Sequence, residues 1–160
     1  MLRPDSMGDL LTAKGLTLAL AESCTGGLIS HCITMAPGSS AYFLGGVVSY
    51  ANAAKERLLG VDAGLLETQG AVSAVVAQQM AAGVRERFGA DIGISVTGIA
   101  GPDGGSPEKP VGLVFMGFAN ARGEVNVRQF KFEGDRLEIK EQTCRAALEW
   151  LREYLDSEEK

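Results

Sequence analysis

The sequence feature that most constrains the fold is a short apolar segment. Small and polar residues follow it, and then a segment that reads as a helix. The segment Leu16-Thr17-Leu18-Ala19-Leu20 has the length of a buried strand, and Ala21-Glu22-Ser23-Cys24-Thr25-Gly26-Gly27 follows it directly. Residues 28–35 then read as a helix. We therefore predict a strand-to-helix turn whose free backbone N–H groups point toward a bound group. The turn carries two nucleophiles, a serine and a cysteine. The alternative is a plain turn in which Ser23 or Thr25 caps the helix.

Strand and helix patterns alternate along the rest of the chain, with one hairpin near its end. Further strands are expected at residues 43–50, 91–96, 111–119 and 125–132, and helices at 51–59, 61–68, 74–88 and from 136 onward. The pair Gly45-Gly46 inside a strand indicates a bulge or a close backbone approach. This order predicts an α/β fold: a single three-layer α/β/α domain built on a mixed sheet.

The expected domain occupies residues 7–156. Residues 1–6 are interpreted as a loose N-terminal leader in which Asp5 or Ser6 caps a short helix that ends at Gly15, and residues 157–160 as a frayed tail. No apolar leader and no run of transmembrane length is present. We therefore expect a cytoplasmic protein that has no membrane partner.

Charge and cysteine content exclude several classes of function. The net charge is −5, so the chain lacks the basic surface that nucleic-acid binding requires, and no nucleic-acid partner is expected. Three cysteines without metal-finger or redox spacing favour free thiols in a reducing compartment. No metal-ligand set is recognisable, because Glu22 and Asp103, which could each touch an ion, lack partners at a helpful spacing.

Few residues could act as the general base for Ser23 or Cys24. The single histidine, His31, lies eight residues after Ser23, which along a helix is roughly 10 Å or more. We interpret it as a surface or packing residue, so a serine–histidine arrangement is disfavoured. Lys55 follows a run of small residues after the glycine-rich strand, where a lysine could be desolvated and serve as a base. The alternative is an ordinary solvated helix lysine.

A second glycine-rich loop follows the strand expected at residues 91–96. It runs from Thr97 to Ser106 as Thr-Gly-Ile-Ala-Gly-Pro-Asp-Gly-Gly-Ser. It is too long for a simple turn, and loops at the ends of buried strands commonly carry function. Neither glycine cluster has the spacing of a P-loop or of a dinucleotide-binding fingerprint.

Six motifs in this order resemble one family, the competence/damage-inducible CinA C-terminal domain family. They are Ala-Glu-Ser-Cys-Thr-Gly-Gly, Pro-Gly-Ser-Ser, Gly-Gly-Val-Val-Ser-Tyr-Ala-Asn-Ala-Ala-Lys, Gly-Ala-Val-Ser, Val-Thr-Gly-Ile-Ala-Gly-Pro-Asp-Gly-Gly-Ser and Gly-Asp-Arg. The resemblance covers about residues 8–155. It implies a nicotinamide-nucleotide amidohydrolase that converts nicotinamide mononucleotide (NMN) and water to nicotinate mononucleotide and ammonia in pyridine-nucleotide salvage, without a metal or cofactor.

The same resemblance assigns roles to individual residues. It places the nucleophile on Ser23 and its lysine base on Lys55. For such a pair, we expect backbone N–H groups at residues 25–27 or in Gly45-Gly46 to hold the oxyanion. Arg136 would anchor an anionic group, and the alternative for it is a salt bridge at a helix start. The substrate-binding residues implied in all are Thr25, Gly26, Gly27, Gly46, Ser49, Tyr50, Thr97, Gly98, Ala100, Gly101 and Arg136. The family often has another arginine four residues on, where this chain has Lys140.

The sequence is also compatible with other functions. The domain could be a nucleotide-binding module without catalysis, or a serine–lysine amidase that acts on another small amide. Cys24 is a weaker rival nucleophile because it lacks a histidine partner. A DNA-related accessory role is disfavoured by the negative net charge. The partner expected is therefore a small molecule, and a homo-oligomer is compatible with the sequence.

Overall fold

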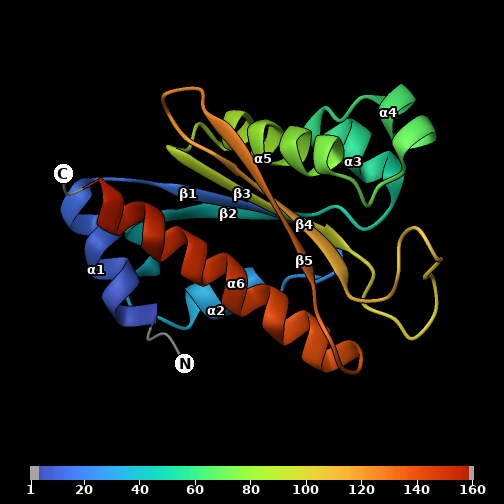
Figure 1. Cartoon of the computed structure of the whole chain (residues 1–160). Helices are drawn as coiled ribbons and strands as arrows, with labels where there is room; N and C mark the ends of the chain where they lie inside the picture. Colours follow the sequence, from blue (N-terminus) through green and yellow to red (C-terminus); the bar gives the residue numbers. More distant parts are fainter. Residues whose placement is uncertain (1–3, 159–160) are drawn as a thin grey trace.

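A mixed five-stranded sheet forms the centre of the molecule (Figure 1). The computed structural model describes residues 4–158. The strands follow the order β2-β1-β3-β4-β5, in which β2, β1 and β3 are parallel and β4 and β5 are antiparallel additions. Their bounds are β1 Leu18–Glu22, β2 Phe43–Val48, β3 Ile92–Gly98, β4 Leu113–Ala119 and β5 Val125–Lys131. The predicted mixed sheet is confirmed.

Helices cover both faces of this sheet, which confirms the three-layer prediction (Figure 1). One face carries α1 Pro4–Lys14, α2 Leu28–Thr34 and α6 Arg136–Ser157, and the other carries α3 Asn52–Leu59, α4 Ala63–Gln69 and α5 Ala74–Phe88. A short 3₁₀ turn, η1 Ser39–Ala41, precedes β2. No helix between residues 4 and 158 is long and apolar enough to cross a membrane.

Both ends of the chain differ from the expected loose segments. Helix α1 begins at Pro4, so residues 4–6 are helical and neither Asp5 nor Ser6 caps the helix from outside. Helix α6 includes Ser157, so the frayed tail predicted from residue 157 is wrong at that residue. The predictions for residues 1–3 and 159–160 lie outside the described residues.

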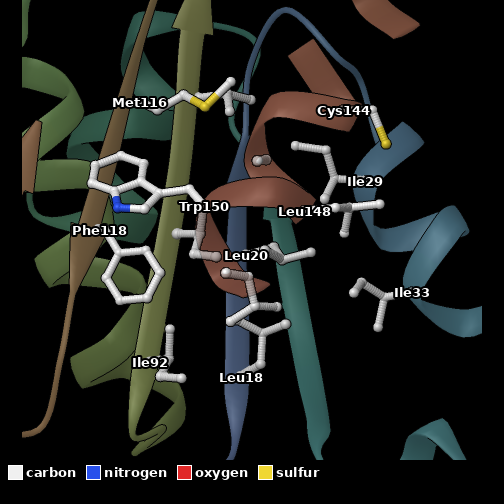
Figure 2. Close-up of a cluster of buried hydrophobic side chains, with 14 of the residues drawn as sticks. Leu18, Leu20, Ile29, Ile33, Ile92, Met116, Phe118, Cys144, Leu148 and Trp150 are labelled. Atoms are coloured by element: carbon white, nitrogen blue, oxygen red, sulfur yellow. The ribbon is translucent and has the colours of Figure 1, made fainter. Parts of the chain in front are cut away.

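The apolar core is divided by the sheet into two clusters. On one face, Leu18 and Leu20 of β1 pack with Ile29 and Ile33 of α2 and with Trp150 of α6 (Figure 2). On the other face, the small residues Ala19 and Ala21 lie beneath α5. Since strand side chains alternate between faces, β1 is buried along its whole length.

Glycines in two strands let α5 approach the sheet closely. A Cβ at Gly93 of β3 would lie 2.4 Å from the backbone oxygen of Ala81, and one at Gly117 of β4 would lie 2.3 Å from that of Ala77. The predicted irregularity at Gly45-Gly46 is also confirmed, because the register of β2 shifts by one residue there. The close approaches at Gly93 and Gly117 fix the position of α5 on β3 and β4.

Candidate active site

The carboxyl ends of the three parallel strands meet at one edge of the sheet, where ligands bind in open α/β sheets. Ser23 follows β1, Ser49 and Tyr50 follow β2, and Thr97 and Gly98 end β3. A cavity of about 220 Å³ opens at this edge. Its lining consists of Ser23, Cys24, Tyr50, Lys55, Ala71, Val72, Thr97, Gly98, Ala100 and Arg136.

Ser23 and Lys55 form a buried polar pair in this cavity. Lys55 lies on α3 with 1% of its surface exposed, and its Nζ is 2.9 Å from Ser23 Oγ. Lys55 Nζ also donates to the backbone oxygen of Ser49 at 2.6 Å and to that of Tyr50 at 3.3 Å. Among the described residues, no carboxyl group contacts this lysine. The prediction of a desolvated lysine is confirmed, and the solvated alternative is wrong.

Burial lowers the pKa of Lys55 below its ordinary value, because a charged ammonium loses hydration there. The two carbonyl oxygens can accept both N–H groups of the neutral amine. The nitrogen lone pair then faces Ser23 Oγ and can accept the hydroxyl proton. This geometry meets the requirement that a serine nucleophile has for an adjacent base.

Glu22 organises the turn that carries Ser23. Its Oε1 accepts from Thr25 Oγ1 at 2.7 Å and from the Ile29 N–H at 2.8 Å. Its Oε2 accepts from the Ser30 N–H at 3.0 Å and from Ser30 Oγ at 2.7 Å. The side chain therefore bridges the end of β1 and the first turn of α2.

This arrangement corrects two predictions about the turn. The N–H groups of Ile29 and Ser30 at the start of α2 are bound by Glu22 and do not point at a ligand. Neither Ser23 nor Thr25 caps α2, because Ser23 contacts Lys55 and Thr25 donates to Glu22. Thr25, Gly26 and Gly27, which were expected to bind substrate, are not among the lining residues of the cavity and lie in the turn that follows Ser23.

The two stretches expected to hold an oxyanion differ in their distance from Ser23. Gly46 pairs with Leu20, three residues before Ser23, or roughly 10 Å along an extended strand. Gly46 is accordingly absent from the residues that line the cavity, so the structure does not bring it to Ser23. In the turn, the Gly26 N–H donates to the Ser23 backbone oxygen, whereas within residues 4–158 the N–H groups of Thr25 and Gly27 have no acceptor.

Cys24 and His31 take no part in this polar pair. Cys24 belongs to the apolar cluster on the α6 side, and burial raises the pKa of its thiol to about 12. A thiol with so high a pKa is a poor nucleophile at neutral pH. His31 is exposed on α2, which confirms its prediction as a surface residue.

Arg136 joins three parts of the cavity rim. At the start of α6, its Nη1 donates to the Gly101 backbone oxygen at 2.7 Å, and its Nη2 donates to Tyr50 Oη at 2.9 Å. Gly101 thus contributes through its carbonyl group. The alternative of a salt bridge at the helix start is wrong for the described residues, in which Arg136 has no carboxyl partner. Asp135 caps α6 through a reciprocal pair of bonds with Glu138.

The remaining predicted residues have distinct places. Gly98 and Ala100 line the cavity, and Thr97 also donates to the Ala71 backbone oxygen at 2.9 Å. The side chain of Ser49 is fully buried, lies outside the lining and has no hydrogen-bond partner in the described residues, so only its carbonyl group serves the site. Ala71 and Val72 also line the cavity, which the sequence did not predict, although they belong to the motif Gly-Ala-Val-Ser.

Charges around the cavity are sparse. The ammonium group of Lys140, half-buried on α6, would lie 3.8 Å from a Cβ at Gly26, on the turn after Ser23. No group of three or more histidine, cysteine, aspartate or glutamate side chains in residues 4–158 is arranged to hold a metal ion. The chemistry that the described residues offer is therefore that of Ser23, Lys55 and nearby N–H donors.

These features define a three-layer α/β domain with a buried serine–lysine pair at the carboxyl ends of its parallel strands. A sequence model of the CinA C-terminal domain matches residues 3–155, and the chain belongs to this family. It is 56% identical over 151 residues to a CinA-like protein of Citrifermentans bemidjiense and 58% identical over 146 residues to one of Geotalea daltonii. These matches cover 94% and 91% of this chain but 36% and 35% of the relatives. The chain thus spans about a third of the length of these curated relatives.

Solved structures of similar length share the whole fold. The competence/damage inducible protein CihA from Agrobacterium tumefaciens is 42% identical, with a TM-score of 0.89 and 96% of both chains covered. A competence-damaged protein (CinA) superfamily protein from Klebsiella pneumoniae is 34% identical, with a TM-score of 0.92 and the same coverage.

Proposed function

We propose that this chain hydrolyses the carboxamide group of NMN, giving nicotinate mononucleotide and ammonia. The single observation that supports this proposal most is the 2.9 Å contact between Lys55 Nζ and Ser23 Oγ in a buried site. A serine hydroxyl becomes a competent nucleophile when an adjacent neutral amine can accept its proton. The family resemblance described above supplies the substrate.

The reaction begins with attack by Ser23. Neutral Lys55 takes the hydroxyl proton as Ser23 Oγ bonds to the carboxamide carbon. The carbonyl oxygen becomes an oxyanion, for which the N–H groups of Thr25 and Gly27, which lack an acceptor in the described residues, are candidate donors in the turn. Protonated Lys55 then gives its proton to the amide nitrogen, and the C–N bond breaks to release ammonia.

The second half of the reaction removes the acyl group from Ser23. Lys55, neutral again, accepts a proton from a water molecule whose oxygen attacks the ester carbon. The C–O bond to Ser23 breaks, and Lys55 returns the proton to Ser23 Oγ. Nicotinate mononucleotide leaves as the product, and no metal or cofactor enters either step.

The shape of the surface favours a nucleotide over a smaller amide. A second hollow of about 410 Å³ shares Ala100 and Arg136 with the catalytic cavity and extends over the start of α6. We place the nicotinamide group beside Ser23 and the ribose phosphate in the second hollow, with the Arg136 guanidinium on the phosphate. Asp135 also lines this hollow, but its side chain is bound to the Glu138 N–H.

The test is ammonia release from NMN by the purified, EDTA-treated chain. Ser23→Ala and Lys55→Met are each expected to lower kcat by about a thousandfold or more while circular dichroism shows an intact fold. Cys24→Ala is the matched control at the neighbouring position and should stay active. A wild-type chain that releases no ammonia would contradict the proposal.

A second comparison tests the placement of the phosphate. Arg136→Gln should raise KM for NMN by about ten- to a hundredfold and leave KM for nicotinamide riboside, which has no phosphate, nearly unchanged. Equal effects on both substrates would contradict this role of Arg136. If the wild type is inactive, calorimetry with NMN separates a binding module from an amidase for another amide, which a panel of small amides would reveal.

A further inference from the structure

Two cysteines far apart in the sequence lie in direct contact between helices α2 and α6. The Sγ atoms of Cys32 and Cys144 are 3.4 Å apart, and the Cys144 thiol donates to Cys32 across 112 positions of sequence. Cys144 is 5% exposed, whereas Cys32 is half-buried at the edge of the same apolar cluster. Figure 2 shows Cys144 beside α2, near Ile29.

The geometry needs little change to form a covalent bond. A disulfide bond brings two sulfur atoms to about 2.05 Å, so these two must approach by a little over 1 Å. All three cysteines are free thiols, and no hydrogen bond in residues 4–158 joins Cys24 to either member of the pair. The pair is therefore distinct from the cysteine beside Ser23.

We propose that Cys32 and Cys144 are a redox-active dithiol that a peroxide oxidises to an intramolecular disulfide bond joining α2 to α6. The Cys32 sulfur attacks one peroxide oxygen, the O–O bond breaks, and a sulfenic acid and one water form. The Cys144 sulfur then attacks the Cys32 sulfur, the S–O bond breaks, and the leaving hydroxide takes the Cys144 proton as a second water. Two thiols and one hydrogen peroxide thus give one disulfide and two waters.

The environments of the two thiols assign them different roles. Cys32 is the member that a peroxide can reach, because its side chain is partly exposed. Cys144 is buried, and burial and the neighbouring Cys32 thiol raise its pKa, so its thiol reacts slowly with peroxide. Contact with the Cys32 sulfur at 3.4 Å offsets this low reactivity toward the oxidised Cys32. Cys32 is therefore oxidised first, and Cys144 completes the bond.

The position of the bond gives it a structural consequence. Helix α2 follows the turn after Ser23, and α6 begins at Arg136, so the bond would tie together two helices that frame the candidate site. Closing a loop of this length restricts the unfolded chain strongly. We expect the oxidised chain to melt about 5–15 °C higher than the reduced chain, with thiol reductant reversing the shift.

The experiment uses the full chain and needs no assay of amide hydrolysis. The reduced protein is treated with a small excess of hydrogen peroxide, quenched with catalase, unfolded and alkylated with N-ethylmaleimide without reductant. Peptide mass mapping should find the Cys32 and Cys144 peptides joined and the Cys24 peptide alkylated. The melting temperature should rise in the same sample and fall again with dithiothreitol.

Variants separate this proposal from unspecific oxidation. Cys32→Ser, at a half-buried position, should fold and should lose both the cross-link and the rise in melting temperature. Cys144→Ala should behave alike, and Cys24→Ala should keep both. A cross-link that includes Cys24, bonds only between molecules, or Cys32 oxidised beyond the sulfenic acid while Cys144 remains a free thiol would each overturn the proposal.

Discussion

At the scale of single residues, Lys55 is the most unusual feature of the molecule. A lysine with 1% exposure and no carboxyl partner among the described residues is costly, because the ammonium group loses its hydration. Backbone oxygens of Ser49 and Tyr50 offset part of this cost. Residues that lower the stability of the fold in this way are expected at functional positions, where the residue is retained for its chemistry.

The lowered pKa of Lys55 predicts how activity depends on pH. In the proposed mechanism the base is the neutral amine, so kcat/KM should rise with pH and level off above the pKa of Lys55 in the folded protein, which lies below the ordinary 10.5. A pH–rate profile with NMN measures this, and Cys24→Ala should give a superimposable curve. A profile that still rises tenfold per pH unit up to 10.5 would contradict the lowered pKa.

The same shift affects stability, in a direction that can be worked out. Because the folded pKa lies below the unfolded value, the unfolded chain binds more protons between these two values. The free energy of unfolding should therefore increase with pH across that window, and Lys55 should contribute no pH dependence below it. Urea denaturation from pH 7 to 10 should show this rise for the wild type relative to Lys55→Met. Parallel curves for the two proteins would argue against it.

Ser49 and Thr97 make a matched pair of buried hydroxyl groups. Ser49 Oγ has no hydrogen-bond partner in the described residues, so Ser49→Ala should change the free energy of unfolding by less than about 0.5 kcal/mol or raise it. Thr97→Val leaves the Ala71 oxygen without its donor and should cost about 1–2 kcal/mol. Urea denaturation measures both, and a larger loss for Ser49→Ala would mean that its hydroxyl has a partner.

At the scale of elements, Glu22 sets the connection between β1 and α2. Glu22→Gln replaces one acceptor oxygen by a donor, which removes the charge and leaves the N–H of Ile29 or of Ser30 without its acceptor. This should cost about 2–4 kcal/mol of unfolding free energy. Because the turn carries Ser23, kcat should also fall. Exposed Glu67 on α4 provides the control, since Glu67→Gln should change stability by less than about 0.5 kcal/mol. Equal effects of both variants would remove the special role of Glu22.

The elements themselves were largely predictable, and the errors have physical causes. The strand and helix runs lie close to those predicted, as α2 and α5 illustrate, although β1 begins and ends two residues later than expected. The start of α1 was misplaced because Asp5 and Ser6 resemble caps, whereas Pro4 at the first helical position has the fixed φ that a helix start favours. Glu22 resembled an isolated acid, since its four donors come from residues three to eight positions later and converge only after the turn forms.

At the scale of the whole molecule, the site depends on contacts that no local pattern contains. The order of the motifs identified Ser23 and Lys55. The position of Gly46 away from the cavity, however, follows from the pairing of β1 with β2. Likewise Arg136 reaches Tyr50 across 86 positions of sequence. Tertiary packing decides such contacts, so a sequence can name the residues of a site without giving their geometry.

The packing of α5 on the sheet is another tertiary contact, and it can be tested at a position far from the cavity. A Cβ at Gly117 would lie 2.3 Å from the Ala77 backbone oxygen and 2.6 Å from Ser95 Oγ, and backbone cannot yield as a side chain can. Gly117→Ala should therefore separate α5 from β4, at a cost of about 3 kcal/mol, and lower the melting temperature by about 6–12 °C. Ser95 bonds both Ala77 and Gly117, so this shift disturbs β3 just before Thr97.

Calorimetry measures the loss of stability, and the KM for NMN reports the disturbance at the end of β3. Ser95→Ala serves as the comparison, because it removes the hydrogen bonds but adds no volume between the layers. It should cost about 1–3 kcal/mol, and Gly117→Ala should cost more. An unchanged melting temperature for Gly117→Ala would mean that α5 can move away from β4 at little cost in free energy. The close packing of α5 on the sheet would then not be a source of stability.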